Sequence, residues 1–175
     1  FFYAAMLFGQ YNEDFEDEAV SSTPDSFSPA MAGDVANFIL IEEEGNLLLR
    51  TNTGVLSTAG SYYLSVSSTQ IDDTTWEFFI DLRFNPSGAN YVDVYLVADD
   101  ANLGSAQNGY FVRIGDTEDW IAMHKLSGGT ASAPLISTAE GILNSSANKP
   151  IRLRVQRDAV GNWTLAIDNG DTGSF

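Results

Sequence analysis

Two stretches decide the fold: Thr75-Trp-Glu-Phe-Phe-Ile-Asp-Leu-Arg-Phe84 and Ile151-Arg-Leu-Arg-Val-Gln-Arg157. In both, apolar and polar residues alternate. Successive side chains of a β-strand point to opposite faces of the sheet, so a period of two buries one face and leaves the other in water. We therefore predict two amphipathic strands, with these residues facing the core: Trp76, Phe78, Ile80, Leu82 and Phe84 in the first, and Ile151, Leu153 and Val155 in the second.

Short strand patterns recur along the rest of the chain, separated by turn residues. Residues 157–168 predict a hairpin whose turn is 158–162, and residues 37–50 predict another whose turn is 44–46. Regularly spaced short strands with Gly, Asn, Asp and Ser turns are typical of a β-sandwich or barrel. No segment has a sustained helical period. Further strands are expected at 62–67, 91–98, 109–115 and 120–126.

The charge balance restricts the classes of partner. The chain has 175 residues, which suits one domain with a sizeable core. Its 8 Lys and Arg residues against 24 Asp and Glu residues give a net charge of −16. Such a field repels phosphate backbones and anionic lipid headgroups, so we expect neither a nucleic-acid partner nor insertion into a membrane after signal removal. The acidity is interpreted mainly as a source of solubility, with Ca²⁺ binding as an alternative.

The composition and the first residues suggest an exported protein. The chain has no cysteine, which excludes disulfides and a Cys nucleophile, but a domain of this size can be stabilised by its core alone. Residues 1–9 are apolar and uncharged, and residues 10–18 are polar and acidic. This change is typical of the end of a secretory signal peptide, cut here after Gly9. The alternative is that residues 1–9 form a first core strand.

The other end of the chain is a cluster of turn residues, 168–175, with no strand after it. We therefore expect a signal-peptide remnant over 1–9 and one β-sandwich over 10–175 that lacks its closing strands. Such a fragment would belong to a larger multidomain chain, secreted or at the cell surface. A missing closing strand predicts an exposed sheet edge.

Three passages together resemble a known family. They are Ser61-Tyr-Tyr-Leu-Ser-Val66, Trp76-Glu-Phe-Phe-Ile-Asp-Leu-Arg-Phe-Asn-Pro-Ser87 continuing to Tyr91-Val-Asp-Val-Tyr-Leu-Val97, and Asn108-Gly-Tyr-Phe-Val-Arg-Ile-Gly115 followed by Arg157-Asp-Ala-Val-Gly-Asn-Trp-Thr-Leu165. They resemble the jelly-roll domain of the concanavalin-like superfamily, and more narrowly the laminin-G-like domain of large secreted and cell-surface bacterial proteins. The resemblance covers about residues 11–170. It implies a two-sheet antiparallel jelly roll with a first acidic strand at 11–17.

The resemblance also raises the question of glycoside hydrolysis. The enzymes of this superfamily carry two catalytic carboxylates on one strand, and the nearest match here is Glu77 and Asp81. Four residues of strand separate their Cα atoms by ~13 Å, whereas the carboxyl groups must approach to about 5.5 Å or about 6.5–9.5 Å. We expect two solvated carboxylates beside Arg83, with catalysis as an alternative. The single histidine, His124, is expected to be structural, because no Gly-x-Ser-x-Gly elbow accompanies it.

Two kinds of ligand-binding residue remain. Carboxylates in turns could converge on Ca²⁺, a cation that prefers oxygen ligands; the candidates are Asp99, Asp100, Asp116 and Asp119, with Asp72 and Asp73 as a further pair. Aromatic rings on a sheet surface could stack on sugars; the candidates are Tyr62, Tyr91, Tyr95 and Trp120. For both sets the alternative is structural, since Asp is common in turns and aromatic rings usually pack in the core.

The expected function is that of a non-catalytic extracellular binding or adhesion module that recognises a glycan or a surface protein. One alternative is a structural spacer in a cell-surface protein. The other is a glycoside hydrolase of the concanavalin-like superfamily.

Overall fold

The computed structural model describes residues 13–24, 32–52, 60–68, 70–144 and 148–175. We expected one domain over residues 10–175, and the chain divides into two compact units, Phe1–Ser67 and Ser68–Phe175, which we describe separately. Segment 1–9, predicted to be a signal-peptide remnant, lies outside the described residues. The described chain is all-β and antiparallel, and its only helical element is a 3-10 turn at Val35–Asn37. No helix in this part is long and apolar enough to cross a bilayer.

The N-terminal unit contains two small sheets. The predicted hairpin is confirmed: β2 (Phe38–Glu43) pairs with β3 (Asn46–Thr51). Its two-residue turn, Glu44-Gly45, has positive φ at both positions (53° and 82°), which suits the right-handed twist of the strands. The second sheet pairs β1 (Ala32–Gly33) with β4 (Leu64–Ser65). The predicted strand at 62–67 is therefore only two residues long.

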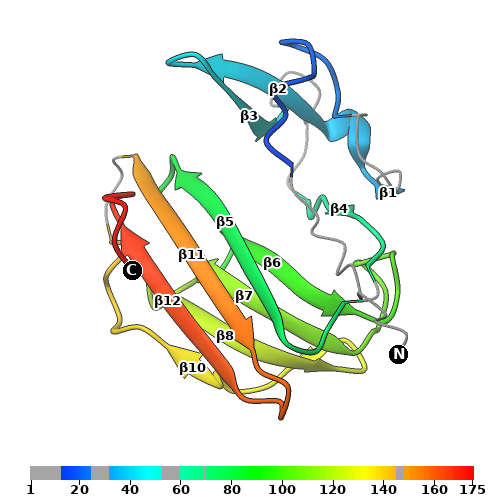
Figure 1. Cartoon of the computed structure of the whole chain (residues 1–175), viewed down its shortest axis with the longest axis vertical. Helices are drawn as coiled ribbons and strands as arrows, with labels where there is room; N and C mark the ends of the chain where they lie inside the picture. The colour runs from blue at the N-terminus through cyan, green and yellow to red at the C-terminus, as the bar shows by residue number, and fades with distance from the viewer. Residues whose placement is uncertain (1–12, 25–31, 53–59, 69, 145–147) are drawn as a thin grey trace, which may run out of the picture. The chain divides into compact units, whose positions relative to one another are not determined.

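The C-terminal unit contains a three-stranded and a five-stranded sheet, drawn as two layers in Figure 1. The three-stranded sheet has the order β12-β11-β5, and the five-stranded sheet has the order β10-β8-β7-β6 with β9 also paired to β8. The strands are β5 (Thr74–Leu82), β6 (Tyr91–Ala98), β7 (Gly109–Gly115), β8 (Trp120–Ser127), β9 (Thr130–Ala131), β10 (Ile136–Ser137), β11 (Lys149–Arg157) and β12 (Trp163–Asn169).

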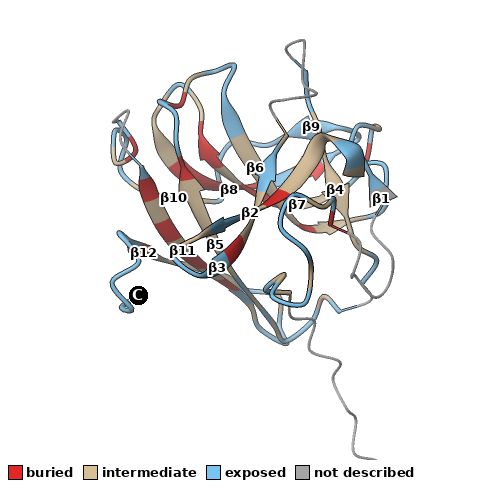
Figure 2. Cartoon of the chain, turned by 90° about the horizontal axis from the view of Figure 1, so that it is seen from above, coloured by how far each residue is buried: buried red, intermediate tan, exposed pale blue. Residues whose placement is uncertain are grey.

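The two sheets of this unit share one hydrophobic core. It takes Leu82 from β5 and three residues of β11 on one side, and residues of β6, β7 and β8 on the other. Ile151, Leu153 and Val155 are fully buried, as their alternation predicts. In Figure 2 the buried stretches fall mainly on strands, and the connecting loops are largely exposed.

Several predicted strands match the structure closely. β6 and β7 have the predicted bounds, and the hairpin turn at 158–162 joins β11 to β12. β11 contains all of the second stretch quoted first, and β5 contains residues 75–82 of the other. Two details were wrong. Phe84, predicted to face the core, is 36% exposed because β5 ends at Leu82. In the acidic segment predicted as a strand at 11–17, the described residues 13–17 form no strand.

Acidic side chains brace several turns by accepting backbone hydrogen bonds. Asp168 accepts bonds from the N–H groups of Thr172, Gly173 and Ser174 at 2.9, 2.7 and 3.2 Å. These bonds, first among them that of Thr172, hold the pKa of the Asp168 carboxyl below its ordinary value. Asp158 braces the β11–β12 turn similarly, and the Asn162 side-chain amide is the main cause of its lowered pKa. We interpreted the acidic residues as a source of solubility; some of them, such as Asp158 and Asp168, also stabilise turns by accepting hydrogen bonds.

Candidate functional site

The register of three strands places several predicted ligand-binding residues on one sheet face. Residues that lie opposite each other in antiparallel strands share a face. Tyr91 of β6 is opposite Gly115 of β7, which in turn is opposite Trp120 of β8. Alternation adds Tyr95 to the same face. We call this surface, which points away from the core, the Tyr91 face; its members are Tyr91, Asp93, Tyr95, Phe111, Arg113, Trp120, Ala122 and His124.

An arginine held by two carboxylates lies at the exposed end of the Tyr91 face. Arg113 donates two hydrogen bonds to Asp93, both at 2.8 Å, and one to Asp116 at 2.9 Å. Its guanidinium carbon lies 3.9 Å from the centroid of the Tyr91 ring, within the range of a cation–π interaction. The Asp93 hydrogen bonds raise the pKa of Arg113, so this cation stays charged. The cluster is preorganised, and Tyr91 beside it is 39% exposed.

The other end of the Tyr91 face is a row of stacked rings that is mostly buried. Tyr95 stacks on Phe111 with centroids 5.4 Å apart, and Phe111 stacks on His124 at 5.2 Å. Burial is the main cause of the raised pKa of Tyr95. His124 Nδ1 lies 2.9 Å from the Ser132 carbonyl oxygen, whereas its buried Nε2 has no hydrogen-bond partner among the described residues. The accessible part of the face is therefore its Tyr91 end.

Of the four predicted aromatic residues, the structure brings three together. Tyr91, Tyr95 and Trp120 share the Tyr91 face, whereas Tyr62 belongs to the N-terminal unit. Tyr110, another tyrosine of β7, points to the core, where its ring lies 4.8 Å from that of Trp163.

The two candidate catalytic carboxylates are each engaged in an ion pair. Both lie on the outer face of the three-stranded sheet, on β5. Glu77 pairs with Arg154 of β11 at 2.9 Å. Asp81 pairs with Arg83 at 2.7 Å and accepts the Lys149 N–H at 2.9 Å. We expected both carboxylates to lie beside Arg83, but only Asp81 pairs with it, whereas Glu77 pairs with Arg154.

The candidate Ca²⁺ ligands fall into two separate loops. Asp99 and Asp100 follow β6, whereas Asp116 and Asp119 follow β7; because these neighbouring strands are antiparallel, the two pairs lie at opposite ends of the sheet. Asp99 accepts both the N–H and the side-chain amide of Asn108, and these bonds lower its pKa.

The Asp116 carboxylate likewise already accepts hydrogen bonds from neighbouring residues. Burial opposes its ionisation, but the Thr117 N–H and the Arg113 guanidinium outweigh that effect and lower the pKa of this carboxyl. Among the residues that the structure describes, no three His, Cys, Asp or Glu side chains converge on a possible metal position. These residues therefore do not fit a Ca²⁺ site built from several carboxylates.

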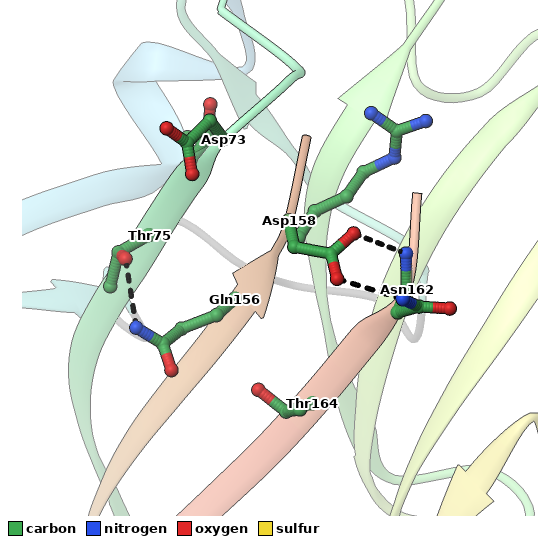
Figure 3. A pocket seen from close by; sticks show the side chains of 8 residues that line it. Asp73, Thr75, Gln156, Asp158, Asn162 and Thr164 are labelled. Atoms are coloured by element: carbon green, nitrogen blue, oxygen red, sulfur yellow. Dashed lines mark hydrogen bonds between the residues drawn. The ribbon is translucent and has the colours of Figure 1, made fainter. Parts of the chain in front are cut away.

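A small polar hollow lies on the outer face of the three-stranded sheet, as Figure 3 shows. Its volume is about 210 Å³. One row of side chains crosses three strands, since Thr75 is opposite Gln156 and Gln156 is opposite Thr164. At the end of the strands the hollow is bounded by Asp73 and by the β11–β12 turn; the lining residues are Asp73, Thr74, Thr75, Gln156, Arg157, Asp158, Asn162 and Thr164.

Sequence reasoning missed Arg113, Asp93 and the Thr75–Gln156–Thr164 row. The alternation of Tyr91, Asp93 and Tyr95 in the sequence could have indicated the mixed aromatic and acidic face, but the partner strand that supplies Arg113 is fixed only by register.

No family model, curated protein or solved structure matches the chain. Its function is therefore inferred from the chemistry of the described residues.

Proposed function

We propose that this chain is a non-catalytic, glycan-binding adhesion module of a secreted or cell-surface protein. Its C-terminal unit would be a jelly-roll sandwich of the concanavalin-like and laminin-G-like kind. Two antiparallel sheets around a shared core support that assignment, as do the chain crossings between the sheets from β5 to β6 and from β10 to β11.

One observation carries the proposal: Tyr91 and Trp120 share a sheet face with a rigid cluster of charged hydrogen-bonding groups. The apolar C–H face of a sugar stacks on an aromatic ring, and its hydroxyls bond to neighbouring polar groups. Tyr91 offers a partly exposed ring with Arg113 over one of its faces, and Asp93 and Asp116 offer carboxylate oxygens that Arg113 already holds in place. Groups fixed before binding lose little entropy when the ligand arrives, which favours affinity.

The test is a glycan array, run with Ca²⁺ present, that compares the wild-type chain with Tyr91→Ala. We expect the wild type to bind a defined subset of glycans and Tyr91→Ala to bind them at least about tenfold more weakly, since one aromatic contact surface is lost. The matched control is Phe84→Ala, which removes an aromatic ring of similar exposure outside the Tyr91 face and should leave binding unchanged. A wild-type chain that binds no glycan on the array would refute the proposal.

A second candidate function is a structural spacer. It is favoured by the burial of Phe111 and Ala122, which removes the middle of the Tyr91 face from any ligand. A spacer would bind nothing on the array, and Tyr91→Ala would leave adhesion to surface proteins unchanged.

A further inference from the structure

We infer that the polar hollow on the three-stranded sheet is a second ligand site, which binds the hydroxylated edge of a single sugar residue through hydrogen bonds. The inference shares only its ligand class with the proposed function, because its residues lie on the opposite sheet from the Tyr91 face. The hollow, called here the Gln156 hollow, is defined by Asp73, Thr75, Gln156, Asp158, Asn162 and Thr164, all of which are exposed.

The geometry of the strands brings these six side chains to one face. Thr75, Gln156 and Thr164 form one row across β5, β11 and β12. Asp73, Asp158 and Asn162 lie just beyond the ends of these strands and also line the hollow. Figure 3 shows the six side chains around the hollow, and every member carries oxygen or amide groups.

The available groups match a polyol better than other ligands. Gln156 donates to the Thr75 hydroxyl oxygen at 3.3 Å, which leaves the Thr75 proton and the Gln156 carbonyl oxygen for a ligand. Within the described residues, nothing bonds to the Thr164 hydroxyl or to the Asp73 carboxylate. Hydroxyl and amide groups both donate and accept, as do sugar hydroxyls. An anion would be repelled by the Asp73 and Asp158 carboxylates, and the cation that lines the hollow, Arg157, is already paired with Asp72.

The wall of the hollow is rigid before any ligand binds. Asp158 accepts the N–H groups of Val160 and Asn162 at 3.0 and 2.8 Å and the Asn162 side-chain amide at 2.8 Å. Gly161 also donates to the Asp158 carbonyl oxygen at 3.0 Å. The hollow, at about 210 Å³, is smaller than the roughly 300–1,000 Å³ of pockets for drug-sized ligands. It therefore suits one small ring rather than an extended chain.

The experiment is a two-dimensional NMR titration of the full chain with single neutral hexoses (glucose, galactose and mannose), carried out in the Tyr91→Ala background to remove the site of the proposed function. We expect saturable shifts of the amide signals of Thr75, Gln156 and Thr164. Thr164→Val, which keeps the side-chain shape and the β propensity, should weaken binding roughly three- to tenfold, the effect of one hydrogen bond. Thr130→Val, an exposed threonine on β9, should have no effect.

Two outcomes would overturn the inference: no saturable shift with any of the three hexoses, or shifts that cluster away from the Gln156 hollow. Neither outcome affects the proposed function, which is read from glycan binding by a chain with Tyr91 intact. Folding of each variant is checked in the same spectra, because a loss of structure would shift signals throughout the sheet.

Discussion

The shared core of the C-terminal unit can be tested with Leu153→Ala. Leu153 is fully buried on β11, the central strand of the three-stranded sheet, and faces core residues of the five-stranded sheet. The substitution removes three buried carbon atoms and leaves a cavity between the sheets. For a fully buried leucine the expected loss is about 3 kcal/mol of unfolding free energy. At about 4–8 °C per kcal/mol for a unit of this size, the melting temperature should fall by roughly 12–24 °C.

Tryptophan fluorescence during guanidinium unfolding is the suitable assay. All three tryptophans, Trp76, Trp120 and Trp163, lie in the C-terminal unit, so the signal reports on that unit alone. With a denaturant slope of about 2–6 kcal/mol/M, the midpoint should fall by about 0.5–1.5 M. The matched control is Leu135→Ala, the same substitution at a side chain that is 50% exposed, where the expected loss is below about 1 kcal/mol.

Equal effects of the two substitutions would refute the shared core. So would a loss at Leu153 of less than about 1 kcal/mol, because a residue on the surface of an isolated sheet would behave in that way.

Two further predictions concern a braced turn and a close backbone approach. Asp168→Asn should lower the melting temperature at pH 7, and the difference in melting temperature between this variant and wild type should shrink below about pH 4. The reason is that the pKa of Asp168 is lower in the folded chain than its value of about 3.9 in the unfolded chain. The stabilisation by the Asp168 carboxylate is therefore present above the unfolded pKa and is lost as the pH falls through the folded pKa. The control is Glu140→Gln, which removes one negative charge from an exposed side chain and should leave the pH dependence of the melting temperature unaltered. A melting-temperature difference between Asp168→Asn and wild type that stays constant at all pH values would count against this account. Gly109→Ala should cost about 2–3 kcal/mol or more in guanidinium unfolding, since its Cβ would overlap the Val97 carbonyl oxygen. Gly141→Ala, with positive φ but open space, should cost only about 1 kcal/mol, and equal losses would contradict the close approach at Val97.

The strands could be predicted from the sequence because their evidence is local. The alternation in β5, β6, β7 and β11 gave their positions nearly residue for residue. Two-residue strands such as β9 and β10 are too short to show a period, so they were missed. Phe84 continues the alternation of β5 but lies beyond its last pair, Leu82 with Lys149, and only the pairing shows where the strand ends.

The candidate site was harder to predict because register decides it. The sequence supplied Tyr91, Tyr95 and Trp120 as separate aromatic residues, but their common face depends on the pairing of Gly115 with two neighbours. Likewise, nothing local to Asp93 indicates the Arg113 guanidinium, which is 20 residues away in sequence. Partners at such separations are set by tertiary structure, and periodicity carries no information about them.

The bracing carboxylates divide the negative charge of this chain into two classes with different tolerance to change. Glu44 and Glu140 are exposed and accept no hydrogen bond from the described residues, so they can be neutralised to reduce repulsion between molecules, for example to promote crystallisation. Asp158 and Asp168 have the same formal charge, but each holds a turn by its backbone N–H groups. A surface redesign that selects acidic residues by exposure alone would remove Asp158 with the first class and loosen the wall of the Gln156 hollow.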